Sequence, residues 1–229
     1  ENMLLFRALV KETCRQRGLH ASFMCRPRRP DVLPSGWHLH QSVLAAETGE
    51  SLFATADGGL TRTASGWIAG LLENAAATCL LSTPTVNGYK RYQPGQLAPD
   101  RIQWGRDNKG AMIRALIRPG DPAARIENRV AEPAANPFLF FASQALAGLD
   151  GVSRGLAAPE PVETPYAGEA PRLPRSLIAA IEAWEESGFV RAAFGAEVQR
   201  YLAHIKRAEW ERYLFTVSEW EEREYFSLF

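Results

Sequence analysis

Apolar residues recur with helical spacing in some parts of the chain and alternate with polar residues in others, so the pattern predicts a mixture of helices and strands. Helical spacing extends over residues 3–17, 63–81, 137–149, 176–186 and 196–226. Alternation with a period of two, typical of half-buried strands, extends over residues 37–43, 111–117 and 125–129. We therefore expect an α+β fold, an antiparallel sheet with helices packed on its outer face, followed by a helical C-terminal tail.

Residues that favour helix ends agree with these ranges. Gly18 follows the first helical stretch, as a capping glycine does. Asn136 stands immediately before the helix that Pro137 begins, and both residue types are favoured at those two positions. Phe138 and Phe141 then form an aromatic stripe on this helix, and we expect that stripe to lie in the core.

Prolines separate the last helices from the rest of the chain. Five of them fall within residues 151–174, which predicts an extended connecting segment. We divide the chain into a body, residues 1–150, a proline-rich connection, residues 151–175, and a helical C-terminal region of the same domain, residues 176–229. The chain begins at Glu1 in helix-like sequence, so we expect the natural protein to begin earlier.

Composition excludes several classes of protein. Lys and Arg number 26 and Asp and Glu number 26, so the formal net charge is zero, which argues against a nucleic-acid binder. A hydrophobic content of 46% excludes global disorder, and no apolar run is long enough to span a membrane. The three cysteines, Cys14, Cys25 and Cys79, are widely spaced, which fits neither a disulfide framework nor a zinc cluster and favours the reducing cytoplasm.

Two predicted strands carry candidate site residues. Strand geometry places the side chains of His38 and His40 on one face, where imidazoles bind metals or contact anions. The second strand places Arg125, Glu127 and Arg129 on one face. In a cleft, such guanidiniums bind carboxylate or phosphate, and the carboxylate between them suits a hard divalent cation. On an exposed face the same residues form only a solvated row of charges.

Two loops carry further cations. Lys90 and Arg91 lie in a loop rich in Gly and Pro, residues 83–99, which is typical of a mobile flap over a site. Lys109 belongs to a turn that precedes the strand carrying Arg114. Taken alone, each of these segments is more typical of a surface turn than of a site.

In order and spacing, these segments resemble the second half of the glutamine synthetase catalytic domain. The matching motifs are Ser35-Gly-Trp-His-Leu-His-Gln-Ser42, Asn87-Gly-Tyr-Lys-Arg91, Asn108-Lys109, Arg125-Ile-Glu-Asn-Arg129, Asn136-Pro-Phe138 and Ala147-Gly-Leu-Asp150. They cover nearly the whole chain. The resemblance implies a ligase that uses ATP and Mg²⁺ or Mn²⁺ to convert glutamate to γ-glutamyl phosphate, which an amine nucleophile then attacks.

The resemblance also implies roles for individual residues. His38 and Glu127 match metal ligands, and Gly36, Arg91 and Arg129 match positions that hold glutamate. ATP contacts are implied for His40, Ser42, Lys109, Arg114 and Arg125. Arg91, Lys109 and Arg114 match the cations that take part in catalysis.

Three departures from the family pattern bear on the substrates. Leu33 and Pro34 replace an Asn-Gly pair that contacts glutamate, and Lys109 replaces an Arg, which removes a bidentate donor. Leu97 stands where ammonia-using enzymes have a Glu. Because leucine neither attracts ammonium nor accepts its proton, Leu97 is a candidate residue of an amine pocket. These departures resemble the γ-glutamylpolyamine and γ-glutamylamide synthetase branch.

Parts of the family's site have no counterpart in this sequence. The other metal-binding glutamates and the small β-grasp domain are not matched, so we expect the 229 residues alone to lack ligase activity. For the complete protein the family implies a ring-shaped homo-oligomer. Two alternatives to an amine ligase remain: a glutamine synthetase proper that uses ammonia, and a catalytically inactive relative with a structural or regulatory role.

Overall fold

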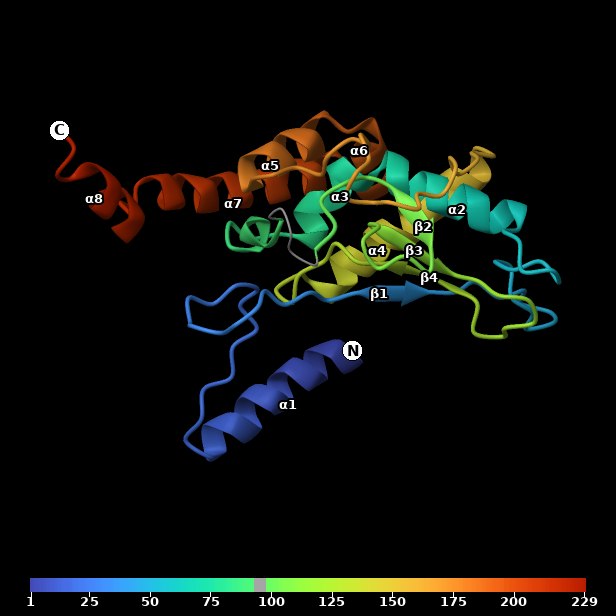
Figure 1. The fold of residues 1–229 in the computed structure, drawn as a ribbon, viewed down its shortest axis with the longest axis horizontal. Coiled ribbons are helices and arrows are strands. Elements are labelled where there is room, and N and C mark those ends of the chain that lie inside the picture. Colours follow the sequence, from blue (N-terminus) through green and yellow to red (C-terminus); the bar gives the residue numbers. More distant parts are fainter. Residues whose placement is uncertain (93–97) are drawn as a thin grey trace.

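The computed structural model describes residues 1–92 and 98–229, and a four-stranded sheet lies at the centre of the fold (Figure 1). Its strands are β1 (Leu39–Gln41), β2 (Trp104–Arg106), β3 (Ile113–Leu116) and β4 (Arg125–Asn128), in the order β1-β4-β3-β2. The predicted α+β class is confirmed. β4 pairs antiparallel with both β1 and β3, as expected.

The expectation of a wholly antiparallel sheet is wrong for one pair, because β2 and β3 run parallel. Only residues 107–112 connect these two strands, and the chain reverses there through Asp107, which has a left-handed backbone with φ of 48°. Asp is among the few residue types that enter this conformation readily. Asn108 stabilises the return, since its side-chain oxygen accepts a hydrogen bond from the Gly110 amide at 3.0 Å.

The two faces of β4 differ as the alternation predicts. Ile126 and Asn128 face the helical layer, where the Asn128 carboxamide donates to Gln144 Oε1 at 2.6 Å. Gln144 belongs to α4 (Pro137–Ser153), whose N-terminus Asn136 caps by accepting from the Phe138 amide at 3.0 Å. Glu127 is therefore directed to the opposite face of the sheet.

The apolar stretch predicted as one helix, residues 63–81, forms two: α2 (Arg62–Glu73) and α3 (Ala75–Ser82). They are separated at Asn74, whose side chain donates to the Gly70 carbonyl at 3.1 Å and so competes with the helical ladder. Before the break, α2 packs closely on α4. A Cβ at Gly70 would lie 2.0 Å from the Ala147 carbonyl oxygen, so only glycine permits this approach.

The C-terminal region forms four helices. They are α5 (Leu177–Glu186), α6 (Gly188–Phe194), α7 (Ala196–Leu214) and α8 (Glu219–Tyr225). α5 packs between α3 and α7, and the end of α7 and α8 extends away from the body (Figure 1). The proline-rich segment lies against β2, where Trp104 Nε1 donates to the Pro159 carbonyl at 2.7 Å.

The N-terminal helix α1 (Asn2–Gln16) lies apart from the helical layer (Figure 1). The expectation that Phe138 and Phe141 lie in the core is wrong, because their exposed fractions are 54% and 41%. Phe140 takes the buried position, and the other two rings line an apolar groove of about 760 Å³ between α4 and the start of α1. Throughout the described ranges, none of the helices combines the length and apolarity needed to cross a membrane.

Candidate functional site

A row of three charged or polar side chains crosses the open face of the sheet. Strand register places His40 of β1 opposite Glu127 of β4, and Glu127 opposite Arg114 of β3. Directly opposed residues have Cβ atoms about 4.5–5.5 Å apart on one face, so the register alone brings the imidazole, the carboxylate and the guanidinium together. The sequence motifs become neighbours because β4 lies between β1 and β3.

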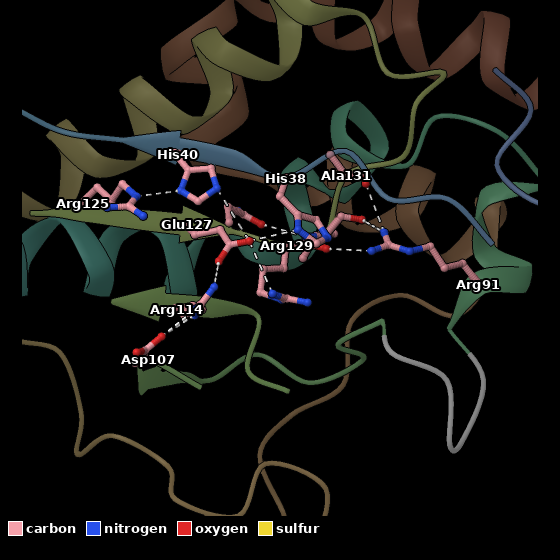
Figure 2. A network of polar contacts seen from close by, with 11 residues as sticks. His38, His40, Arg91, Asp107, Arg114, Arg125, Glu127, Arg129 and Ala131 are labelled. Atoms are coloured by element: carbon pink, nitrogen blue, oxygen red, sulfur yellow. Dashed lines mark hydrogen bonds and ion pairs between the residues drawn. The ribbon is translucent and has the colours of Figure 1, made fainter. Parts of the chain in front are cut away.

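Glu127 is the centre of this cluster (Figure 2). Its side chain is only 3% exposed, with Arg114 Nη1 at 3.0 Å from Oε2, and with His38 Nδ1 at 3.0 Å and Arg129 Nη1 at 3.4 Å from Oε1. Burial raises the pKa of this carboxyl. The hydrogen bond from Arg114 and the charge of Arg129 lower the pKa by more than burial raises it. The net pKa lies below its ordinary value, so Glu127 is a carboxylate at neutral pH.

The two histidines differ in environment. Burial and the neighbouring Arg129 charge lower the pKa of His38 to about 4, so its imidazole is neutral. Nδ1 lies on the side of Glu127 and Nε2 lies beside Gly36, and the neutral ring keeps a lone pair on one of these nitrogens for a ligand. His40 accepts a hydrogen bond at Nδ1 from Arg125 Nε at 3.1 Å, which places the proton of the neutral ring on Nε2, the atom nearer Glu127.

Arg91 reaches the site from the 3₁₀ helix Gly88–Arg91. Arg91 is 5% exposed, and its guanidinium donates to three backbone carbonyls: those of Arg129 at 3.0 Å, Val130 at 2.7 Å and Ala131 at 3.1 Å. These bonds fix the plane of the guanidinium (Figure 2). The same segment that supplies Glu127 and Arg129 therefore also holds Arg91.

A pocket of about 210 Å³ lies beside the cluster. Its lining residues are Leu33, Pro34, Gly36, His38, Arg91, Ala98 and Arg129. Two guanidiniums thus face an apolar wall formed by Leu33, Pro34 and Ala98. Arg129 Nε is buried and has no hydrogen-bond partner within the described residues. An unpaired buried donor is costly.

Asp107 is a site residue that the sequence patterns did not reveal. Its Oδ1 accepts from both Nε and Nη2 of Arg114, the first at 2.9 Å, and its Oδ2 accepts from Arg118 at 3.0 Å. Arg114 is therefore held between two carboxylates, Asp107 and Glu127. In the sequence, Asp107 is visible only as an acidic residue in a turn before a predicted strand. Its contact with Arg114 depends on the parallel pairing of β2 and β3.

The structure brings together most of the predicted site residues. One connected network contains His38, His40, Arg114, Arg125, Glu127 and Arg129, and the adjoining pocket adds Gly36 and Arg91. Lys109 and Ser42 are exposed, and within the described residues neither contacts this network. Leu97, the candidate amine-pocket residue, lies outside the described residues.

The donor set of the cluster fits part of a divalent-cation site. A neutral imidazole and a carboxylate with their nearest atoms 3.0 Å apart, His38 and Glu127, are suitable ligands. However, over residues 1–92 and 98–229 no three His, Cys, Asp or Glu side chains are grouped to hold a metal ion. These two residues therefore supply only some of the ligands that Mg²⁺ or Mn²⁺ requires.

Comparison with known proteins agrees with this arrangement. Residues 1–225 match the family model described as glutamine synthetase, catalytic domain. The chain is 40% identical over 239 residues to gamma-glutamylanilide synthase from Acinetobacter sp, covering 98% of this chain and 48% of that protein. It is 36% identical over 240 residues to glutamine synthetase from Thermus thermophilus, covering 100% of this chain and 53% of that enzyme.

Solved structures resemble the fold over almost its whole length. A structure titled apo GmaS without ligand superposes with a TM-score of 0.85 at 32% identity, covering 97% of this chain and 52% of that one. A GmaS/ADP complex gives a TM-score of 0.88 at 31% identity, covering 98% and 53%. The chain thus spans about half the length of these relatives, and it belongs to the glutamine synthetase family.

Proposed function

We propose that this chain is part of an ATP-dependent ligase that joins the γ-carboxyl group of glutamate to an amine. The observation that supports the proposal most strongly is the buried Glu127 carboxylate, surrounded by His38, Arg114 and Arg129 beside a pocket with two guanidiniums. A scaffold without a ligand has no physical need for such a buried cluster, because burying charges is costly. Since the chain spans about half of each relative, residues outside it complete the site.

The proposed reaction has two steps. A γ-carboxylate oxygen of glutamate attacks the γ-phosphorus of ATP, and the bond from that phosphorus to the oxygen of ADP breaks. The amine nitrogen then attacks the acyl carbon of γ-glutamyl phosphate and loses a proton. Phosphate leaves with the oxygen that came from glutamate, and the product is a γ-glutamyl amide with ADP.

The chain's own residues would orient both substrates. Arg91 and Arg129 would bind glutamate carboxylate in the pocket, since both guanidiniums line it. Arg114 and Arg125 would face the phosphates of ATP from β3 and β4, with His40 beside them. His38 and Glu127 would hold Mg²⁺ or Mn²⁺, which supplies charge neutralisation at the transferred phosphoryl group when bound. Lys109 and Ser42 would contribute only after movement of their segments.

An amine larger than ammonia is the nucleophile that we favour. The relative with 40% identity is named for a γ-glutamyl anilide, the amide of an aromatic amine. Leu97 carries the same expectation from sequence alone. Ammonia is the alternative, and the relative named glutamine synthetase at 36% identity supports it.

Phosphate release by the purified full-length protein tests the proposal. With ATP, Mg²⁺ and glutamate, the rate is compared for ammonium, alkylamines, a polyamine and aniline at equal concentrations. We expect an amine to support a kcat/KM at least about tenfold above that of ammonium, the difference made by one or two buried methylene-sized contacts. Efficient turnover with ammonium alone contradicts the choice of amine, and no turnover with any nucleophile contradicts the ligase.

The 229 residues alone are expected to be inactive. The described part of the chain offers only two suitable metal ligands, His38 and Glu127. A truncated chain assayed beside the full-length protein should release no phosphate above the background rate. Ligase activity in the truncated chain would show that the site is complete without further residues.

An inactive relative with a structural or regulatory role is the alternative that remains. Metal-dependent binding of ATP by the full-length protein separates the two, because only a functional site needs both. The remaining parts of the proposal follow the family: a homo-oligomeric, ring-forming protein of the cytoplasm that requires no nucleic acid or membrane.

A further inference from the structure

Glu132 is a buried acid that lies three residues beyond Arg129 and outside the network described above. Its side chain is fully buried, at 0% exposure. Oε1 accepts hydrogen bonds from the Thr85 amide at 3.1 Å and from the Thr85 hydroxyl at 2.7 Å. Oε2 is buried without a hydrogen-bond partner in the described part of the chain. Such burial destabilises a protein, so a compensating role is expected.

The carboxyl group serves as the support of a tight turn. Thr85, which it holds, accepts through its own hydroxyl from the Gly88 amide at 3.1 Å. Gly88 lies so close that an added Cβ would be 2.5 Å from Glu132 Oε1. The 3₁₀ helix that begins at Gly88 ends at Arg91. The turn therefore determines the position of the Arg91 backbone.

Two attachments therefore join residues 85–91 to residues 129–132. At one end Glu132 accepts from Thr85, and at the other the Arg91 guanidinium donates to the carbonyls of residues 129–131. The guanidinium reaches those carbonyls only if the turn presents it at the right distance. Removing the first attachment leaves the long Arg91 side chain and the adjoining Tyr92 hydroxyl, which donates to the Val130 carbonyl at 3.1 Å, to hold the two segments together.

The opposite wall of the pocket is tied to the same turn. Asn87 exchanges two hydrogen bonds with the backbone of Arg26, at 2.8 and 3.0 Å. The neighbouring Cys25 is buried, and its thiol donates to the Ser35 carbonyl at 3.2 Å. Ser35 directly precedes Gly36 of the pocket. The turn on Glu132 thus connects the wall that carries Gly36 with the guanidinium that faces it.

We propose that Glu132 is a positioning residue of the substrate pocket, acting through Thr85 and the 85–91 turn on the guanidinium of Arg91. It contacts neither substrate nor metal. The inference rests on the proposed function for its kinetic consequence, because Arg91 is assigned there to glutamate. Its structural consequence, a displaced Arg91, does not depend on that assignment.

Two substitutions distinguish a role of Glu132 in positioning Arg91 from a purely structural role of a buried side chain. Glu132→Ala removes the acceptor for Thr85, whereas Glu132→Gln keeps an oxygen acceptor in nearly the same shape. In the full-length protein, Glu132→Ala should raise the KM for glutamate at least about tenfold, as sub-ångström misplacement of a binding group does. The KM for ATP should stay within about twofold, and Glu132→Gln should restore most of the glutamate KM.

A matched control accounts for lost stability. Gln199 is likewise buried and polar, and its carboxamide donates to three backbone carbonyls between α5 and α7, away from the pocket. Gln199→Ala should lower the melting temperature without changing the glutamate KM. Equal losses of stability in the two alanine variants with unchanged glutamate KM in both overturn the proposal. Where Glu132→Ala does not fold, Thr85→Val removes one of the two donors and serves in its place.

A readout without catalysis distinguishes failure of this inference from failure of the proposed function. The Arg91 Nε–H resonance in a side-chain ¹H–¹⁵N spectrum, assigned by its loss in Arg91→Lys, reports the fixed guanidinium. It should shift or broaden in Glu132→Ala and remain in place in Glu132→Gln. If the wild-type protein shows no ligase activity, this spectrum still decides the inference, and an unchanged Arg91 resonance in Glu132→Ala refutes it.

Discussion

Gly36→Ala probes the pocket with a single methyl group. The added Cβ would lie 2.5 Å from Arg91 Nη2, 2.9 Å from its Cζ and 3.0 Å from His38 Nε2. Ordinary contact begins near 3.4 Å, so the guanidinium must move by about 0.9 Å. It is not a free chain end, because it donates to three carbonyls at 2.7–3.1 Å.

The cost of that movement follows from the hydrogen bonds. A shift of this size lengthens at least one charge-assisted bond beyond hydrogen-bonding distance, which costs about 1.5–3 kcal/mol. If the displaced guanidinium also loses one charge-assisted contact to glutamate, the affinity for glutamate falls by about 10- to 100-fold. We expect this loss in the KM for glutamate, with the KM for ATP much less affected because Arg91 lines the pocket assigned to glutamate.

The assay is ATP-dependent phosphate release over a range of glutamate concentrations, beside a thermal melt of each variant. Gly188→Ala is the matched control, since a Cβ at Gly188 would meet no atom within 4 Å among the described residues and its backbone has no positive φ. The control should bind glutamate as the wild type does. A Gly36→Ala protein whose glutamate KM stays within twofold of the wild type would refute the packing of Gly36 against Arg91.

Three further predictions concern neighbouring groups. Asp107→Asn leaves Arg114 with one carboxylate instead of two, so kcat/KM for ATP should fall by about tenfold; tighter ATP binding would mean that Asp107 competes with phosphate. His38→Ala should raise the Mn²⁺ concentration needed for half-maximal activity at least about tenfold. Activity is titrated with Mn²⁺ beside His20→Ala, a control at an exposed histidine, and an unchanged Mn²⁺ requirement would show that His38 is not a metal ligand. Burial raises the pKa of Glu132. The protonated side chain therefore contributes to the free energy of unfolding below about pH 4.3, and this contribution is lost as pH rises through the folded-state pKa. Chemical denaturation should therefore show Glu132→Gln gaining stability relative to the wild type between acidic and neutral pH, and a constant difference would contradict the raised pKa.

Strand periodicity predicts which candidate side chains share a face of their own strand. Because side chains alternate along a strand, Arg125 and Glu127 had to share a face, and His38 and His40 had to share another. The register then placed those two faces together, which periodicity alone does not determine. The family resemblance supplied that missing relation, and the structure agrees, with His38 and Glu127 3.0 Å apart.

Residues whose role depends on distant contacts were not predictable from local pattern. Asp107 meets Arg114 only because β2 and β3 run parallel, and Glu132 meets Thr85 across 47 positions of the chain. Helical spacing also misplaced Phe138 and Phe141, because it identifies an apolar stripe but not the element that covers it. In this structure the rings face a groove beside α1.

The same limit applies to the break at Asn74. Apolar spacing continues across that position, so the sequence pattern predicts one helix. The Asn74 side chain instead donates to the Gly70 carbonyl and lies 3.4 Å from Asp150 of α4. The break is thus stabilised by a tertiary contact as well as a local one, and only the local one is visible in the sequence.

Transfer of oxygen from glutamate to phosphate tests the central claim most directly. Full-length protein is supplied with ATP, the preferred amine and glutamate labelled with ¹⁸O in its γ-carboxyl group, and the released phosphate is analysed by mass spectrometry. If these side chains activate the carboxyl group as an acyl phosphate, each phosphate carries one ¹⁸O atom, and Glu127→Gln releases almost none. Unlabelled phosphate formed together with amide would contradict the account.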